Sequence, residues 1–394
     1  MQKKAEPSNA PSWWESDVFL PMYDVLIIGS GIVGLSAALH LAAYSPRLKV
    51  AVVERGSLPL GASTRNAGFA CFGSMTELLA DADQHSEAAM LGLVERRWRG
   101  LQGLRQRVGE QAMHYQGLGG YEVFRRGEEE SFQRCADQLS AINKQLASIT
   151  GLPETFTVVD ERIEQFGFQS VEHLILNRAE GQLHPGLMMK TLLGKARAAG
   201  VTIFKGFPVD WIEEQEQHLV LHSPEGLRLQ GQKVLVATNG FASTLLPELD
   251  LQPVRNQVLI TRPIAGLKVR ACFHYDRGFY YFRNVGNRLL IGGGRHLRPE
   301  EEQTDQLGLT PPIQQALQAM LDQIVLPEQA YEIEARWSGI LGVGGEKKPI
   351  VKQVGERIFV AVRLGGMGVA IGTLVGEEGA ELLLNGVATT KSAD

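Results

Sequence analysis

The chain has 394 residues, of which 44% are hydrophobic and 21% charged, and its formal net charge at pH 7 is −5. This length allows two domains in a soluble globular protein, and an acidic chain without a clustered basic face argues against a nucleic-acid partner. Three cysteines without paired spacing predict neither a disulfide framework nor a metal site, and no apolar run resembles a signal segment or a membrane span, so we expect a cytoplasmic protein.

Residues 24–34 are the most informative segment, because an apolar strand there leads directly into a glycine-rich loop. Gly29 allows a sharp turn, Gly31 lets the backbone approach a pyrophosphate, and Gly34 lets the next helix pack closely on the sheet. The free N–H groups and the dipole of that helix favour an anion at its start. The pattern predicts a dinucleotide-binding loop.

The surroundings of this loop support the same prediction. A helix with apolar residues at helical spacing follows it, and a second strand at 49–54 ends in Glu54. An acid in that position is placed to bind ribose hydroxyls. A glycine-rich turn without a ligand is the alternative interpretation, and this context argues against it.

Further along the chain, residues 74–150 are rich in Glu, Gln, Arg, Leu and Ala. This composition predicts helices, interrupted by one extended piece around 121–124. Another helix at 187–199 precedes a strand at 201–204. Alternating strands and helices therefore resume there.

The second half of the chain contains more predicted strands. Residues 218–236 resemble a hairpin that ends in a buried strand at 233–238, and short β runs between turn residues fill 254–334, with a helix near 311–325. The strand at 357–362 enters a glycine-rich turn at 365–368 and then a closing helix. The start of that helix is expected at the carboxyl edge of the first sheet, where open α/β folds bind ligands.

The segment after Glu54 narrows the choice of dinucleotide. Small and hydrogen-bonding residues at 61–68 suit a close approach of the backbone to a second phosphate and a planar ring, and a nicotinamide enzyme needs no such segment. With its neighbours, this segment resembles the FAD-dependent family of D-amino-acid oxidase, glycine oxidase and sarcosine oxidase. The resemblance covers nearly the whole chain after residue 22. Its matching segments are residues 24–43, 54–68, 234–240, 253–259 and 337–372.

The resemblance implies an α/β fold with a Rossmann-like FAD-binding domain of the glutathione-reductase-2 type and an antiparallel-sheet substrate domain. The FAD-binding domain would be discontinuous, comprising residues 1–85, 150–250 and 335–394. The substrate-binding domain would comprise residues 86–149 and 251–334.

The resemblance also implies which residues hold a non-covalently bound FAD. The glycine loop would hold the pyrophosphate, Glu54 the adenosine ribose, and the backbone of Val209 the adenine. Residues 61–69 would meet the ribityl chain and the flavin, and the turn at 364–370 would approach the pyrimidine edge. The full expected set is Gly29, Ser30, Gly31, Ile32, Val33, Gly34, Glu54, Arg55, Ser63, Thr64, Arg65, Asn66, Gly68, Phe69, Val209, Thr238, Leu364, Gly365, Gly366, Met367, Gly368 and Val369.

Three residues are candidates for contact with the substrate. Tyr280 falls where members of the family place a substrate-facing tyrosine, and a core or surface tyrosine is the alternative. Arg283 and Arg363 could each pair with a substrate carboxylate, and a structural salt bridge is the alternative for both. His274 and His296 are minor candidates for acid–base work.

The chain departs from the family at four positions. Where glycine oxidase-like proteins carry carboxylate-binding arginines it has Leu341 and Gly366, and the glycine of the Pro-Val-Arg-Gly-Gln motif is Asn256. The lysine that sarcosine oxidases use for oxygen activation aligns with Leu290. The substrate is therefore left open among an amine, a larger amino compound and an amino acid bound by a relocated arginine.

The implied reaction is oxidation of a C–N bond by hydride transfer to flavin N5, which gives an imine, with oxygen as the default acceptor. The alternative is an FAD-dependent dehydrogenase of an amino or 2-hydroxy acid that passes electrons to a quinone or carrier. An NAD(P)H-dependent reductase would need a second nucleotide loop, which the sequence lacks. A flavin-binding protein without turnover is the remaining alternative. The expected partners are a small amine or amino acid and an electron acceptor.

Overall fold

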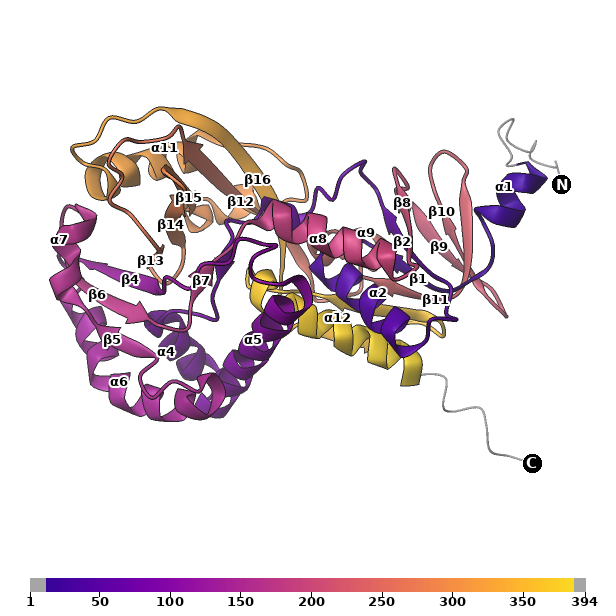
Figure 1. The fold of residues 1–394 in the computed structure, drawn as a ribbon, viewed down its shortest axis with the longest axis horizontal. Helices are drawn as coiled ribbons and strands as arrows, with labels where there is room; N and C mark the ends of the chain where they lie inside the picture. The colour runs from indigo at the N-terminus through magenta and orange to yellow at the C-terminus, as the bar shows by residue number, and fades with distance from the viewer. Residues whose placement is uncertain (1–11, 386–394) are drawn as a thin grey trace.

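The computed structural model describes residues 12–385. Two large β-sheets form two lobes, with the sheet that carries the glycine loop on the right of Figure 1 and the other on the left. Helices α5 (Glu87–Val108) and α12 (Gly368–Asn385) pack against each other where the lobes join.

The first sheet is parallel at its centre and has the strand order β17-β18-β11-β1-β2-β8. β1 pairs in parallel with both β2 and β11, whereas β17, β9 and β10 add antiparallel pairs. The central strands are buried on both faces, which explains their continuous apolar sequences. The strands are β1 (Tyr23–Ile28), β2 (Val50–Glu54), β8 (Thr202–Lys205), β9 (Trp211–Glu214), β10 (Leu219–His222), β11 (Arg228–Val236), β17 (Ile350–Gln353) and β18 (Ile358–Val362).

Helix α12 lies very close to two other helices. A Cβ atom on Gly376 would collide with the carbonyl oxygen of Val33 in α2, and one on Gly100 of α5 would collide with the carbonyl oxygen of Ala370. Glycine at these positions therefore lets helix backbones touch, which holds the last helix against the first part of the chain. The other helices around this sheet are α2 (Ile32–Tyr44), α3 (Ala62–Arg65), α8 (Pro185–Ala198) and α9 (Ala242–Leu245).

The second sheet has the order β16-β12-β15-β14-β13-β4-β6-β5, and all neighbours are antiparallel except β13 and β4. Helix α11 (Pro311–Met320) and the π-helical turn after it pack on one face over a hydrophobic core. The opposite face of this sheet faces the lobe that carries the glycine loop. The strands are β4 (Gly120–Arg125), β5 (Phe156–Val158), β6 (Val171–Asn177), β12 (Gln252–Thr261), β13 (Cys272–Tyr275), β14 (Tyr280–Val285), β15 (Arg288–Gly293) and β16 (Ile333–Val343).

The α/β class, the parallel cofactor-type sheet and a second, largely antiparallel sheet are confirmed. The structure differs from the expected division at two places. Within residues 150–250, β5 and β6 are hydrogen-bonded next to β4 in the second sheet, and residues 335–343 lie in β16, which pairs with β12 in the same sheet. No described helix is both long and apolar enough to cross a bilayer. The remaining elements are α1 (Trp13–Val18), β3 (Phe69–Ala70), α4 (Met75–Gln84), α6 (Glu129–Thr150), α7 (Ile163–Phe166), β7 (Gly181–Gln182) and α10 (Pro299–Glu302).

Candidate functional site

The glycine loop sits at the carboxyl ends of the parallel strands. Gly29 has φ 106°, a left-handed conformation that favours glycine, and its N–H donates to the carbonyl of Val53 at 2.9 Å. A Cβ on Gly34 would collide with the carbonyl oxygen of Gly29. Gly31 is the N-cap of helix α2 and brings no side chain to it, while the Ile32 N–H donates to the Ser63 hydroxyl at 3.0 Å. The next N–H groups of the first turn could bind an anion.

Glu54 ends β2 beside this loop and is 9% exposed. Its Oε2 accepts hydrogen bonds from the backbone N–H and the hydroxyl of Ser30, at 3.3 and 2.6 Å, and its Oε1 accepts one from the N–H of Gly56 at 3.1 Å. These three bonds hold the carboxylate in a fixed place. Its free lone pairs can accept hydroxyl donors from a ribose.

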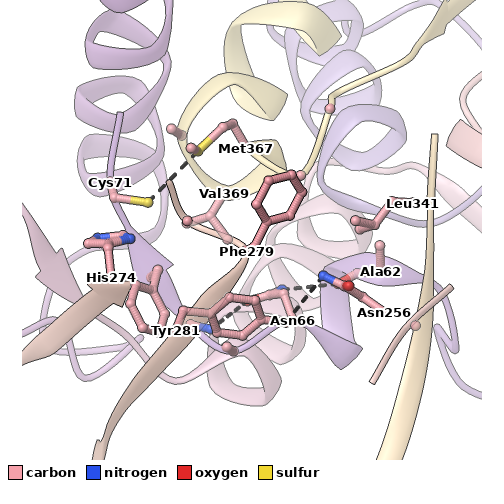
Figure 2. A pocket seen from close by; sticks show the side chains of 18 of the residues that line it. Ala62, Asn66, Cys71, Asn256, His274, Phe279, Tyr281, Leu341, Met367 and Val369 are labelled. Carbon is pink, nitrogen blue, oxygen red and sulfur yellow. Dashed lines mark hydrogen bonds between the residues drawn. The ribbon is translucent and has the colours of Figure 1, made fainter. Parts of the chain in front are cut away.

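A cavity of about 360 Å³ starts at the glycine loop, and a second one of about 270 Å³ reaches the face of the antiparallel sheet. The two cavities adjoin each other, because they share the lining residues Ala62, Asn66, Leu341, Gly366 and Val369. Figure 2 shows the second cavity, with Asn66 and Ala62 on one side and His274, Phe279 and Tyr281 on others. A long ligand can therefore run from the parallel sheet to the second sheet.

The expected cofactor set lines these two cavities, with two exceptions. Gly34 packs beneath the loop, and the Thr64 hydroxyl donates to the carbonyl of Pro59. The residues fit a dinucleotide, since the Thr238 hydroxyl is a buried polar group on the cavity wall without a partner among the described residues. A Cβ on Gly31 would also come within 2.9 Å of the Ser63 hydroxyl oxygen.

The tyrosine that faces the second cavity is Tyr281, whereas Tyr280 points into the opposite core. Successive residues of a strand face opposite sides, so the two neighbours cannot both reach the cavity. A Cβ on Gly292 would lie 2.6 Å from the Tyr281 ring, so glycine on β15 lets this ring lie across the sheet. Burial raises the pKa of Tyr281.

The two candidate arginines make structural contacts instead of lining the cavity. Arg283 is buried and donates to the carbonyls of Ala67 and Leu183, the latter at 3.0 Å. Arg363 donates to the carbonyl of Lys348 at 2.8 Å and to the Asp250 carboxylate at 2.6 Å. Neither belongs to the lining of either cavity.

Positively charged side chains other than Arg283 and Arg363 line the second cavity. Its lining includes one carboxylate, Glu77, and five cationic side chains: Arg65, Arg97, Arg277, Arg295 and Lys347. Sequence reasoning missed Arg295, which follows the positive-φ pair Gly293 and Gly294. That glycine pair was visible in the sequence as the end of a strand, but only the structure shows that it directs the next side chain to the cavity.

His274 lines the same cavity and forms a buried ion pair with Glu180, with Nε2 and Oε2 2.8 Å apart. Burial alone would lower the pKa of His274, but the Glu180 carboxylate, helped by Glu77 and Glu122, outweighs it and raises this pKa to about 9. Cys71 lies nearby, and one potential ligand atom from each of Cys71, Glu180 and His274 falls within 4.8 Å of the others. The histidine and the carboxylate already bind each other there.

Leu290, the position expected to carry a lysine in sarcosine oxidases, is buried against Ala67 and Val258. Leu341 and Gly366 line both cavities without bringing a charge. His296, the other histidine considered, lies 3.4 Å from Asp276 and outside the lining. The charged side chains of the second cavity are therefore the arginines named above together with Lys347, His274 and Glu77.

Comparison with known proteins agrees with this geometry. A family model described as FAD dependent oxidoreductase matches residues 24–382. A glycine oxidase of Geobacillus kaustophilus is 26% identical, over 90% of this chain and 91% of that protein. A probable oxidoreductase, OrdL, of Rhizobium meliloti is 24% identical, over 92% of this chain and 83% of that protein.

Solved structures with similar folds include an L-proline dehydrogenase of P. horikoshii and a glycine oxidase of Bacillus cereus. The first has a TM-score of 0.73 and 18% identity, covering 93% of this chain and 94% of that one. The second has a TM-score of 0.72 and 20% identity, covering 92% and 97%. At these identities the likeness concerns the fold.

Proposed function

The chain belongs to the family of FAD-dependent oxidoreductases, and on this premise we propose that it oxidises the C–N bond of an amine or amino acid. The observation that carries the proposal is the pair of adjoining cavities. The first begins at the glycine loop, and the second, called the second chamber below, is lined by aromatic and cationic side chains. Curated relatives include glycine oxidases, and similar folds include an iminodiacetate oxidase and L-amino acid deaminases. These names all describe enzymes that act on amino compounds.

FAD, when bound, supplies the redox chemistry by accepting a hydride from the carbon next to the amine nitrogen. The residues of this chain would bind and orient the cofactor. The start of α2 would hold the pyrophosphate, Glu54 the ribose, and the loop at 65–69 would support the ring system. The start of α12, at Gly368, would place its positive dipole end near the pyrimidine edge.

The second chamber would exclude water from the reacting carbon. Phe279, Tyr281, Leu341 and Met367 line it, so an amine entering there leaves bulk solvent. Loss of water favours the neutral amine, which is the form that can give up a hydride at its neighbouring carbon.

Oxygen is the default electron acceptor in this proposal. One observation favours a quinone or carrier protein instead, since the buried Leu290 presents no cation where an oxidase-type lysine would stand. Lys347 does line the chamber, but it pairs with Asp81. The cytoplasmic location expected from the sequence stays a prediction.

The experiment is anaerobic titration of the purified holoprotein with D-amino acids, N-methyl amino acids, polyamines and 2-hydroxy acids. The expected result is a yellow protein whose visible absorbance is bleached by at least one amino compound. Air is then admitted to one sample and a quinone to another, to identify the acceptor. Bleaching by hydroxy acids alone, or by no compound in the panel, would overturn the proposed C–N chemistry.

A further inference from the structure

We propose that Arg295 anchors a carboxylate of the substrate from the antiparallel-sheet side of the second chamber. The inference rests on the proposed function and narrows it to amino compounds that carry a carboxylate. Glycine oxidase-like proteins carry their carboxylate-binding arginines at the positions of Leu341 and Gly366. Arg295 stands at neither of these positions.

The local backbone brings Arg295 to the chamber. β15 ends at Gly293, and both Gly293 and Gly294 have positive φ, at 114° and 80°. The Gly294 N–H donates to the carbonyl of Phe279 at 2.9 Å, which fixes this reversal against β14. The Arg295 guanidinium carbon then lies 5.7 Å from the centre of the Phe279 ring, over the chamber.

The other cations of the chamber already have partners. Arg65 donates to the carbonyls of Leu60 and Ser338, at 3.0 and 2.8 Å, and Arg97 donates to the carbonyl of Phe72 at 2.8 Å. The remaining two pair with carboxylates: Lys347 with Asp81, and Arg277 with Asp276 at 3.7 Å.

Arg295 differs from all four. Over residues 12–385 its guanidinium has neither a hydrogen bond nor an ion pair, and burial lowers the pKa of that group. Arg295 is half-buried. Taking a cation partly out of water without a counterion costs free energy, and the planar fork of arginine matches a carboxylate with two parallel hydrogen bonds. A carboxylate arriving with the substrate would supply the missing partner.

A second unpartnered group lies on the neighbouring strand. Asn256 on β12 donates through Nδ2 to the Tyr281 hydroxyl at 3.3 Å, while its Oδ1 is buried in the chamber wall without a partner among the described residues. An amide end of this kind can accept an N–H of the substrate. Arg295 and Asn256 thus offer complementary contacts for the two ends of an amino acid-like group.

The charged side chains around the whole second chamber also favour a substrate that carries a carboxylate. With Lys347 and Arg277 paired to carboxylates, Arg65, Arg97 and Arg295 stand against Glu77, and this excess of positive charge favours anions over polyamines. Neutral or cationic amines therefore gain nothing from this lining.

The test uses benzoate and benzamide as probes of the holoprotein, because they share a ring and differ in charge. Binding is measured by perturbation of the FAD visible spectrum and by calorimetry, for the unaltered protein and for R295M, R295K and R298M. Arg298 is exposed, lies three residues away and is outside the chamber, so R298M controls for loss of one positive charge.

The expected result is benzoate binding that R295M weakens by about 30-fold or more and that R295K restores in part. R298M should bind benzoate like the unaltered protein, and benzamide binding should be the same in all four. With an oxidised amino acid, R295M should raise KM much more than it lowers kcat. If R295M proves unstable, R295K still carries the test through a smaller rise in KM with FAD retained.

Equal benzoate affinity in R295M and the unaltered protein would overturn the assignment, as would an equal loss in R298M. This failure differs from failure of the proposed function. In the first case amino compounds still bleach the flavin, whereas in the second no amino compound does, whatever the result with benzoate.

Discussion

His274 and Glu180 form an ion pair 2.8 Å long in the wall of the second chamber, and their side chains are only 6% and 1% exposed. They come from β13 and from the turn before β7, so the pair ties two distant segments together. Neither charge can turn to solvent when the other is removed.

Removing one partner should therefore destabilise the protein strongly. We expect Glu180→Gln to lower the free energy of unfolding at pH 7 by about 3 kcal/mol, since it leaves a buried imidazolium unpaired. The double variant Glu180→Gln with His274→Gln should recover part of this loss. Urea unfolding measures both, and a Glu180→Gln protein as stable as the unaltered one would contradict the prediction.

The same pair predicts a pH dependence. The pKa of His274 rises from 6.5 to about 9 on folding, so its contribution to stability is complete below pH 6.5 and is lost as the pH rises through 9. We expect the free energy of unfolding of the unaltered protein to fall between pH 7 and pH 10. His274→Gln should flatten this part of the curve, measured by urea unfolding at each pH.

Ionisation of Glu122 should lower the free energy of unfolding as the pH rises, whereas ionisation of an ordinary paired carboxylate raises it. Burial raises its pKa to about 7, although hydrogen bonds from Thr76 and Ser74 partly oppose the shift. Its contribution to stability is thus lost as the pH rises from 4.5 through 7. We expect Glu122→Gln to be more stable than the unaltered protein at pH 8, by about 1–3 kcal/mol, and not at pH 4.5.

The control for this variant is Glu248→Gln, because Glu248 is exposed. It should change the free energy of unfolding little at either pH. A gain from Glu122→Gln of the same size at both pH values would point to packing and not to a buried charge.

Two glycine-to-alanine changes separate cofactor binding from helix propensity. Gly34→Ala places a methyl group against the Gly29 carbonyl, so we expect loss of FAD and a stability loss of about 1–3 kcal/mol. Gly194 lies in the exposed part of α8 with nothing within 4 Å of a new Cβ. Gly194→Ala should retain FAD and gain about 0.5–1 kcal/mol.

The FAD content of both variants follows from the ratio of visible to protein absorbance. Full FAD content in Gly34→Ala would contradict the role given to the close contact between loop and helix.

Arg283 should affect the cofactor and not the substrate. Its guanidinium holds the carbonyls of Ala67 and Leu183, which fixes the loop expected to support the flavin ring. We expect Arg283→Met to reduce FAD content while KM of the remaining holoprotein is unchanged, and Arg283→Lys to restore little, because lysine lacks the planar fork. A large rise in KM with full FAD content would return Arg283 to substrate binding.

The sequence predicted best those parts of the site that are formed by a few consecutive residues. The glycine loop, Glu54 and the second glycine turn each lie beside the same cavity, because strand, turn and helix follow one another over a few residues. Contacts between distant segments were harder to predict. Nothing near 121–124 indicates that β4 pairs with β6 and with β13, so the assignment of residues 150–250 differed at β5 and β6.

The choice between Tyr280 and Tyr281 shows a second limit. Both are tyrosines on one strand, and only the phase of the strand decides which one faces the chamber. Arg283 shares the face of Tyr281, yet the loop at 66–68 covers it. Arg295 depends on two glycines in left-handed conformations, whose effect on direction cannot be read from residue type.

The contact between α12 and α2 has a consequence for biosynthesis. The ribosome delivers the glycine loop early, but the cavity wall at 364–369 and the helix behind it emerge more than 300 residues later. A nascent chain that stops before residue 364 has the loop without the opposite wall. If FAD needs both walls, we expect it to bind only after this segment has left the ribosome, and unfinished chains to lack it.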